Sequence, residues 1–227
     1  MDNDTSRRPR FDAATTHRGF IAGRARPSAP AVARSQTTRV IHLLLLILVL
    51  HQLIGSEFVS RPLPGDTPEW PYLMHEYIGL IGLGVVLAFW IWTLFRRGET
   101  RLGRLFPWLS IGRIRDVMAD GAAQARRLLQ GRVPHDGDGA MASAVHGLGL
   151  LTVSAMAITG SVFFFADGAS AARWALTLHR LIANLMWAYL IGHAGLAALH
   201  ELLGDDVLTR MFWVRPRRRR SRVSRNR

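Results

Sequence analysis

Histidines in apolar surroundings are the residues of this sequence best suited to chemistry. The stretch 178–200, "LHRLIANLMWAYLIGHAGLAALH", is almost wholly apolar and carries three of them. A neutral imidazole binds a metal without adding charge, and ionisable residues in lipid are costly and usually functional. Taken singly, each could instead make a hydrogen bond between helices. Seven of the nine histidines lie in or beside apolar runs: His42, His51, His75, His146, His179, His193 and His200.

Two of these histidines share one face of one predicted helix. His179 and His193 are 14 residues apart, which at about 100° per residue is only about 40° short of four full turns. The helical rise separates them by roughly 21 Å along the axis. A single metal centre cannot use both residues, whereas two flat cofactors stacked at different depths can.

The composition restricts which cofactors these are. The chain has no Cys, which excludes a disulfide relay, a thiolate-held iron–sulfur cluster and a haem attached through Cys-x-x-Cys-His. Any redox cofactor must therefore be bound non-covalently. Hydrophobic residues make up 49% of the 227 residues, yet the formal net charge is +13. This division between apolar and basic segments is typical of a membrane protein.

Four apolar runs are long enough to position these histidines within a membrane. A hydrocarbon core of about 30 Å requires roughly 20 residues of helix, and long runs without alternation favour helices over strands. We therefore predict an all-α membrane protein, a four-helix up-down bundle. Its spans are expected at about 40–59, 72–95, 141–165 and 174–203.

The distribution of arginine predicts the orientation of the bundle. Eight Arg precede the first span, nine lie between residues 96 and 140, and nine follow residue 203, whereas the other two loops hold one each, Arg61 and Arg173. The positive-inside rule then predicts that both termini and the loop 96–140 are cytoplasmic.

This orientation pairs histidines from different helices by depth. The fourth span runs inward, so His179 is expected near the periplasmic side and His193 deeper toward the cytoplasm. His75 begins the second span level with His179, and His42 begins the first span nearer to His193. Two transverse pairs result, and bis-histidine ligation occupies both axial positions of a haem iron, which favours electron transfer over oxygen activation.

Residues beside the four ligand candidates fit a porphyrin. Gly79 and Ala183 lie one turn after His75 and His179 on the same faces, where small side chains let a flat ring approach, although helix packing alone also selects small residues. We expect Arg39 and Arg180 to contact haem propionates at opposite surfaces. Arg180 is notable because it lies on the arginine-poor side.

The remaining histidines have less defined expectations. His51 is nine residues from His42 and so on the opposite helix face, which makes it a poor ligand for the same cofactor. His146 is expected to line the haem or quinone site near the cytoplasmic end of the third span. His200 is expected to contact quinone or propionates near the inner surface, and packing roles are the alternative for both.

The sequence divides into three parts. Residues 1–38 are predicted to be a disordered basic tail, residues 39–211 the four-helix domain, and residues 212–227 a second basic tail. Within the loop 96–140, residues 110–130 predict an amphipathic helix that lies on the membrane surface. The basic tails fit anionic lipid and topology locking, so membrane lipids and not nucleic acid are the expected partners.

Four segments together resemble bacterial cytochrome b561. The most specific is "LHRLIANLMWAYLIGHAGLAALHELLGDDVLTRM" at 178–211, which is similar to the last helix of that family. "RVIH" at 39–42, "HEYIGL" at 75–80 and "AVHGLGLLTVSAMAITG" at 144–160 resemble the other three helices. The resemblance covers residues 39–211. The wider superfamily also includes the membrane cytochrome subunits of hydrogenases and formate dehydrogenases.

The resemblance implies a di-haem b-type cytochrome of the bacterial inner membrane that exchanges electrons with the quinone pool. Its four ligand positions would be His42, His75, His179 and His193, holding two haem b groups, with quinone as substrate and no separate catalytic residue. A periplasmic or cytoplasmic electron-donor protein is a further expected partner. One branch of the family oxidises superoxide, but this chain offers few cations for that purpose on its outer side.

Two other functions are consistent with the sequence. The chain could be the cytochrome anchor subunit of a larger respiratory complex, in which case it would purify with soluble partners. It could instead be a metal-ion transporter with histidine relay ligands. That hypothesis predicts Asp or Glu in mid-span, whereas Glu76 and Glu201 lie near span ends.

Overall fold

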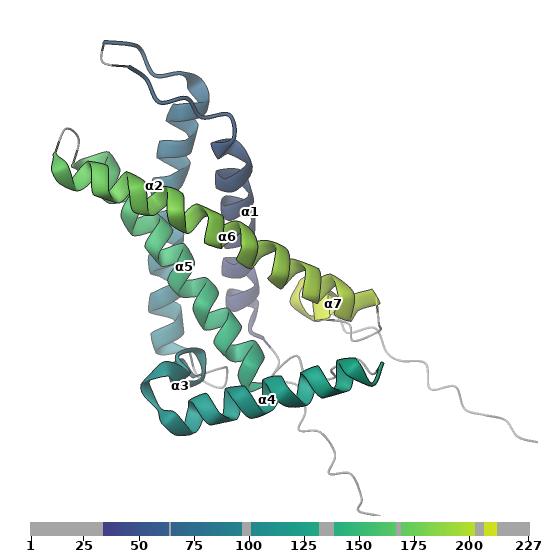
Figure 1. Ribbon diagram of the computed structural model, residues 1–227. Coiled ribbons are helices and arrows are strands. Elements are labelled where there is room, and N and C mark those ends of the chain that lie inside the picture. The colour runs from purple at the N-terminus through teal and green to yellow at the C-terminus, as the bar shows by residue number, and fades with distance from the viewer. Residues whose placement is uncertain are drawn as a thin grey trace, which may run out of the picture. The chain divides into compact units, whose positions relative to one another are not determined.

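The computed structural model describes residues 34–63, 65–96, 101–131, 139–166, 169–202 and 207–212. All the described residues belong to one compact unit. The predicted tails 1–38 and 212–227 lie almost wholly outside the described residues. The helices, shown in Figure 1, are α1 (Gln36–Ser56), α2 (Trp70–Phe95), α3 (Leu102–Leu105), the 3-10 helix η1 (Pro107–Leu109), α4 (Ile111–Leu129), α5 (Ala140–Phe165), α6 (Ser170–Leu202) and α7 (Val207–Phe212).

Four of these helices, α1, α2, α5 and α6, are long and apolar enough to cross a membrane. The prediction of an all-helical protein with four candidate spans is confirmed. The first helix begins at Gln36 rather than near Val40, because Ser35 caps it by accepting a hydrogen bond from the Thr38 amide at 3.2 Å. Apolar content alone does not reveal this cap, so the helix begins before the apolar run that defines the predicted span.

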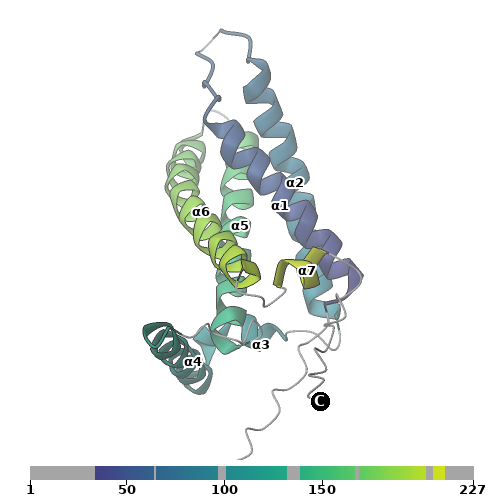
Figure 2. The same ribbon diagram turned by 90° about the vertical axis from the view of Figure 1, so that its right-hand side faces the viewer.

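The four long helices pack in sequence along the chain. Helix α1 packs on α2, α2 on α5, and α5 on α6. The connections α1–α2 and α5–α6 lie at the same end of the bundle, whereas α3 and α4 lie at the other end (Figures 1 and 2). Neighbouring helices therefore run in opposite directions, as an up-down bundle requires. Which end faces the cytoplasm stays a prediction.

Polar side chains join the apolar helices at a few positions. The indole Nε1 of Trp92, near the end of α2, donates to Thr38 Oγ1 at the start of α1 over 2.8 Å. Trp90 Nε1 donates to Ser154 Oγ of α5 over 2.9 Å. Such bonds between helices compensate polar groups that hydrocarbon cannot solvate, and they fix which residues lie level with one another.

The described part of the loop 96–140 is mainly helical and packs against the first half of α5. The amphipathic helix predicted at 110–130 is present as α4, whereas α3 and η1 were not predicted. Gly147 of α5 makes the contact with α3 possible, because a Cβ at this position would collide with the carbonyl oxygen of Leu105. The ring of Phe106 also stacks on Trp90 with centroids 5.5 Å apart.

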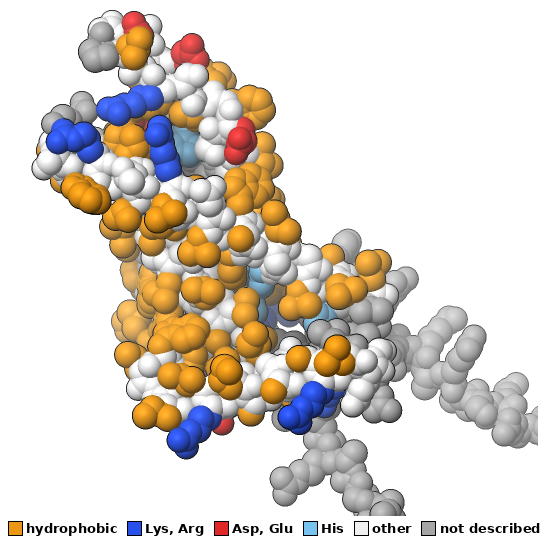
Figure 3. All heavy atoms as spheres, in the orientation of Figure 1, with side chains coloured by type: hydrophobic (Ala, Val, Ile, Leu, Met, Phe, Trp, Pro, Cys, Tyr) orange, Lys and Arg blue, Asp and Glu red, His pale blue; other side chains and the backbone are white. Residues whose placement is uncertain are grey.

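Large apolar side chains cover the outside of the four long helices. Ile47, Ile81, Ile158 and Ile191 expose between 55% and 67% of their surface, and hydrophobic side chains cover much of the face of the bundle that Figure 3 shows. In water such a surface would associate or aggregate, whereas lipid tails solvate it. The protein therefore presents the exterior of a membrane-embedded bundle.

Candidate functional site

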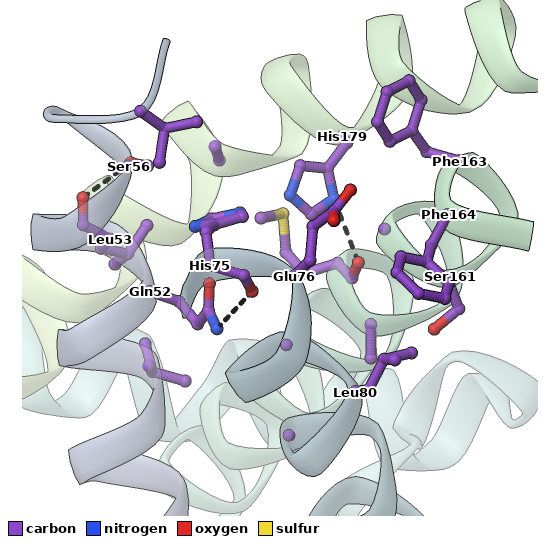
Figure 4. A pocket seen from close by; sticks show the side chains of 18 of the residues that line it. Gln52, Leu53, Ser56, His75, Glu76, Leu80, Ser161, Phe163, Phe164 and His179 are labelled. Atoms are coloured by element: carbon purple, nitrogen blue, oxygen red, sulfur yellow. Dashed lines mark hydrogen bonds between the residues drawn. The ribbon is translucent and has the colours of Figure 1, made fainter. Parts of the chain in front are cut away.

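A cavity of about 490 Å³ lies among α1, α2, α5 and α6. Its volume is within the range of pockets that hold organic cofactors. Leucine and valine are the most frequent residues of its wall, and both His75 and His179 line it. Figure 4 shows these two imidazoles beside each other, one from α2 and one from α6.

The distance between His75 and His179 fits one metal between them. Their ring centroids are 6.2 Å apart and their planes are nearly perpendicular, at 89°. Two imidazoles that bind a metal from opposite sides through bonds of about 2 Å hold their ring centroids about 6 Å apart. The pair that we predicted from depth alone is therefore brought together at a separation suited to axial ligation.

Helix α5 orients the ring of His179. Nδ1 of His179 lies 3.0 Å from Thr159 Oγ1 and 3.1 Å from the carbonyl oxygen of Met156. The Thr159 hydroxyl donates to the carbonyl oxygen of Ala155 at 2.7 Å, so its oxygen accepts from the imidazole Nδ1–H. This arrangement leaves Nε2 with its lone pair available to a metal, as is usual for ligating histidines.

His75 is held by its backbone rather than by its ring. The Gln52 amide of α1 donates to the carbonyl oxygen of His75 at 3.0 Å, which joins α1 to α2 at the level of the cavity. The Nδ1 atom of His75 is buried without a hydrogen-bond partner among the described residues. A buried polar atom without a partner is costly, and a bound ligand is one common reason why proteins keep one.

His42 and His193 form a second pair nearer the other end of the bundle. Their ring centroids are 6.4 Å apart, with planes inclined at 57°. His42 Nδ1 is likewise buried without a hydrogen-bond partner in the described part of the chain. The spacing again fits two imidazoles on opposite sides of one metal. Both transverse pairs expected from the sequence are thus close in space.

Three other rings surround the second pair. Tyr189, one turn before His193 on α6, stacks on its imidazole at 5.3 Å with an interplanar angle of 10°. His146 of α5 meets the same imidazole edge-on at 5.1 Å, and its Nδ1 lies 2.7 Å from the carbonyl oxygen of Ala142. Phe212 of α7 lies 6.3 Å from the His42 ring. His146 therefore lies beside a candidate ligand, as expected, whereas Tyr189 and Phe212 were not foreseen.

Small residues line the first cavity at the predicted places. Gly79 and Ala183 both face it, and so do Gly82 and Gly160. A Cβ added to Gly160 would lie 3.2 Å from Cε1 of His179, which is tighter than ordinary packing. A glycine at this position therefore gives the candidate ligand room on α5.

Charged residues gather near the same cavity. Arg180 lines it, as do Arg61 and Glu76. The Arg61 guanidinium lies over the Phe163 ring at 5.4 Å from its centroid, which fixes it beside α5. Figure 3 shows basic side chains grouped around a histidine at this end of the bundle. Arg61 was not predicted as a site residue, because a loop arginine has no fixed helical phase.

The cavity lining does not include Arg39, His51 or His200. Arg39 is half-buried in the first turns of α1, one turn before His42. His51 is exposed on α1, in agreement with its expected place away from the ligand face. His200 is half-buried near the end of α6 and is not part of the cavity lining. Across the described ranges, no three His, Cys, Asp or Glu side chains converge to hold a bare metal ion.

Comparison with known proteins agrees with this geometry. The family model described as prokaryotic cytochrome b561 matches residues 33–213. This range includes all four long helices and both histidine pairs. No curated protein and no solved structure matches the chain.

Proposed function

Because the chain belongs to the prokaryotic cytochrome b561 family, which implies a b-type cytochrome with a role in electron transfer, we propose that it is a di-haem cytochrome that exchanges electrons with the quinone pool. The observation that carries this proposal is the pair of imidazole separations, 6.2 Å and 6.4 Å, at two levels of one bundle. Two levels are needed to conduct electrons between the two sides of a membrane.

We assign the axial ligands residue by residue. His75 and His179 would hold one haem b in the apolar cavity, and His42 and His193 would hold the other. The haem supplies one-electron redox chemistry at its iron. The histidines saturate both axial positions, and the apolar walls exclude water, so that oxygen binding is disfavoured and the potential is set by burial and hydrogen bonding.

The arginines near the first cavity suit the carboxylates of a haem. Arg180 lies next to His179 in sequence, and Arg61 approaches the cavity from the α1–α2 connection. Guanidinium groups bind carboxylates through charge-assisted hydrogen bonds, which are strong where water is scarce. We propose that both contact propionates at this level, and that Arg39 has the corresponding role at the level of His42.

The quinone pool is the proposed exchange partner, since a quinone dissolves in the same lipid that surrounds the four spans. The cell membrane of a bacterium is the corresponding location, with the His75–His179 level on the periplasmic side. Family membership favours this function over a metal-ion transporter. The cytochrome could also serve as an anchor subunit, and the following experiment separates the two roles.

The direct test is the reaction of the purified single chain with quinols and quinones. We expect the oxidised chain to be reduced by ubiquinol or menaquinol, and the reduced chain to be reoxidised by the matching quinone, as followed by the visible haem spectrum. A b-type spectrum that responds to neither would refute the quinone assignment. Recovery of that response only with co-purified soluble subunits would assign the chain as an anchor.

A further inference from the structure

Helix α4 has an apolar face that the bundle does not use. Its side toward α5 includes polar and small residues: Asp120 Oδ2 accepts from the backbone amide of Met141 at 2.8 Å, and Gly121 lies against the Met141 side chain. Gln124 donates to Asp120 Oδ1 at 3.2 Å and supports that contact. Asp120 of α4 therefore caps the first residues of α5.

The unused face is continuous along the whole helix. At about 100° per residue, six apolar residues fall within an arc of about 80°. These six are Ile111, Ile114, Met118, Ala122, Ala125 and Leu129. All six are exposed: Ile111 by 71%, Met118 by 68% and Leu129 by 89%. A face of this width is usually buried, and the described part of the chain does not bury it.

The position of α4 indicates what covers this face. The helix lies crosswise at the end of the bundle where α2 ends and α5 begins (Figures 1 and 2). In η1, immediately before α4, Trp108 and Leu109 are also exposed, by 49% and 87%. Met141 and Leu148 of α5 are exposed as well. On the face drawn in Figure 3, hydrophobic side chains extend from the long helices down to α4.

The charges on α4 match an anionic surface. The helix carries four arginines and two aspartates, and one of those aspartates, Asp120, is engaged in capping α5. Arg115 and Arg126 are exposed and flank the apolar arc on the same side. Figure 3 shows hydrophobic side chains along α4, with basic side chains at its lower edge. Basic residues beside an apolar stripe are typical of helices that lie in the interface of anionic membranes.

We propose that α4 binds anionic lipid by lying in the head-group region of the same bilayer that the four spans cross. Its apolar arc faces the acyl chains, and Arg115 and Arg126 contact phosphates of the head groups. The polar cap from Asp120 to α5 then sets the depth at which α5 enters the membrane. This role is independent of haem binding.

The absence of Cys from the chain permits a site-directed spin-label test on the full-length protein in vesicles. Met118→Cys reports on the apolar arc, and Asp116→Cys, exposed on another side of α4, is the matched control. Ile111→Cys repeats the measurement on the same arc about two turns from Met118. A single poorly folded variant therefore does not decide the outcome. The probes are molecular oxygen, which concentrates in lipid, and a water-soluble nickel chelate.

We expect labels at 118 and 111 to be accessible to oxygen and shielded from nickel, with the reverse at 116. We also expect the labels at 118 and 111 to lie deeper in vesicles that contain phosphatidylglycerol than in pure phosphatidylcholine. Equal nickel access at 116 and 118 would place α4 in water and overturn the proposal. Shielding of 118 from both probes would assign the face to a protein partner. Equal depth in the two lipids would refute the anionic preference.

Discussion

The imidazole of His179 illustrates how a single side chain is prepared for ligation. Its Nδ1–H is directed to Thr159 and Met156 of the neighbouring helix, so the tautomer with a free Nε2 is favoured. Gly160 provides the room for this orientation. Little more than one turn of α5, residues 156–160, therefore acts on one candidate ligand, although none of those residues is itself a ligand.

Replacement of Thr159 by Val tests this orienting role. The substitution retains the shape of the side chain but removes one of the two oxygens that lie beside Nδ1 of His179. We expect haem affinity at this level to fall by about 10-fold, since partners behind a metal ligand typically have effects of that order. Transfer of haem to an excess of a soluble apo-haem protein measures the change.

The matched control is Ser154→Ala, which removes a hydroxyl on the same helix that binds Trp90 instead of a histidine. Haem transfer from this control should match that of the unaltered protein. Equal retention in the Thr159 variant and the control would show that the hydroxyl does not position His179.

At this scale, sequence reasoning found the histidines but not their neighbours. The 14-residue separation and the depth of each span were sufficient to pair His75 with His179 and His42 with His193. Sequence reasoning did not identify Thr159, Tyr189 or Arg61. The position of each depends on how one helix lies against another or on the path of a loop. No single-helix periodicity contains that information. The structure adds the distances, and ligation itself stays a proposal.

At the scale of elements, the contact of α3 with α5 depends on one missing side chain. A Cβ at Gly147 would meet backbone atoms of Leu105, which cannot rotate away as a flexible side chain could. Helix α3 is only four residues long and has few other means of attachment. The same segment brings Phe106 onto Trp90, so its displacement would also disturb the end of α2.

We therefore expect Gly147→Ala to destabilise the protein by about 1–3 kcal/mol, the usual cost of overpacking. Thermal unfolding in detergent, followed by circular dichroism, measures the loss as a lower midpoint. Gly192→Ala is the control, since a Cβ there meets nothing within 4 Å. An unchanged midpoint for the Gly147 variant would mean that α3 does not pack as described.

The sequence predicted those helices whose apolar or amphipathic pattern is long. The four spans and α4 have at least 19 residues each, so their apolar length or amphipathic period is unmistakable. Helix α3 and η1 are too short to establish a period, and their position depends on the glycine of another helix. Helix α1 begins before its apolar run because a capping serine, and not hydropathy, determines its first residue.

At the scale of the whole molecule, the distribution of arginine predicts which end of the bundle faces the cytoplasm. The two loops at one end of the bundle hold a single arginine each, whereas the terminal segments and the loop 96–140 hold eight or nine. Insertion machinery retains such segments in the cytoplasm. If the predicted orientation holds, the basic face of α4 lies against the anionic cytoplasmic leaflet.

Reporter fusions test this orientation. A phosphatase that is active only in the periplasm should be inactive when fused after residue 212 and active when inserted in the connection near Arg61. A cytoplasmic reporter at the same positions should give the opposite pattern. Periplasmic activity of the C-terminal fusion would contradict the predicted topology and, with it, the assignment of the His75–His179 level to the outer side.

The most direct test of the central claim is the number of b-type haems per chain, from a reduced-minus-oxidised spectrum and haem quantification. We predict two for the unaltered protein, one each for His179→Ala and His193→Ala, and two for the control His51→Ala, whose side chain is exposed. An unchanged ratio of haem to chain in the first two variants, or no haem in a folded chain made with ample haem, would contradict the account.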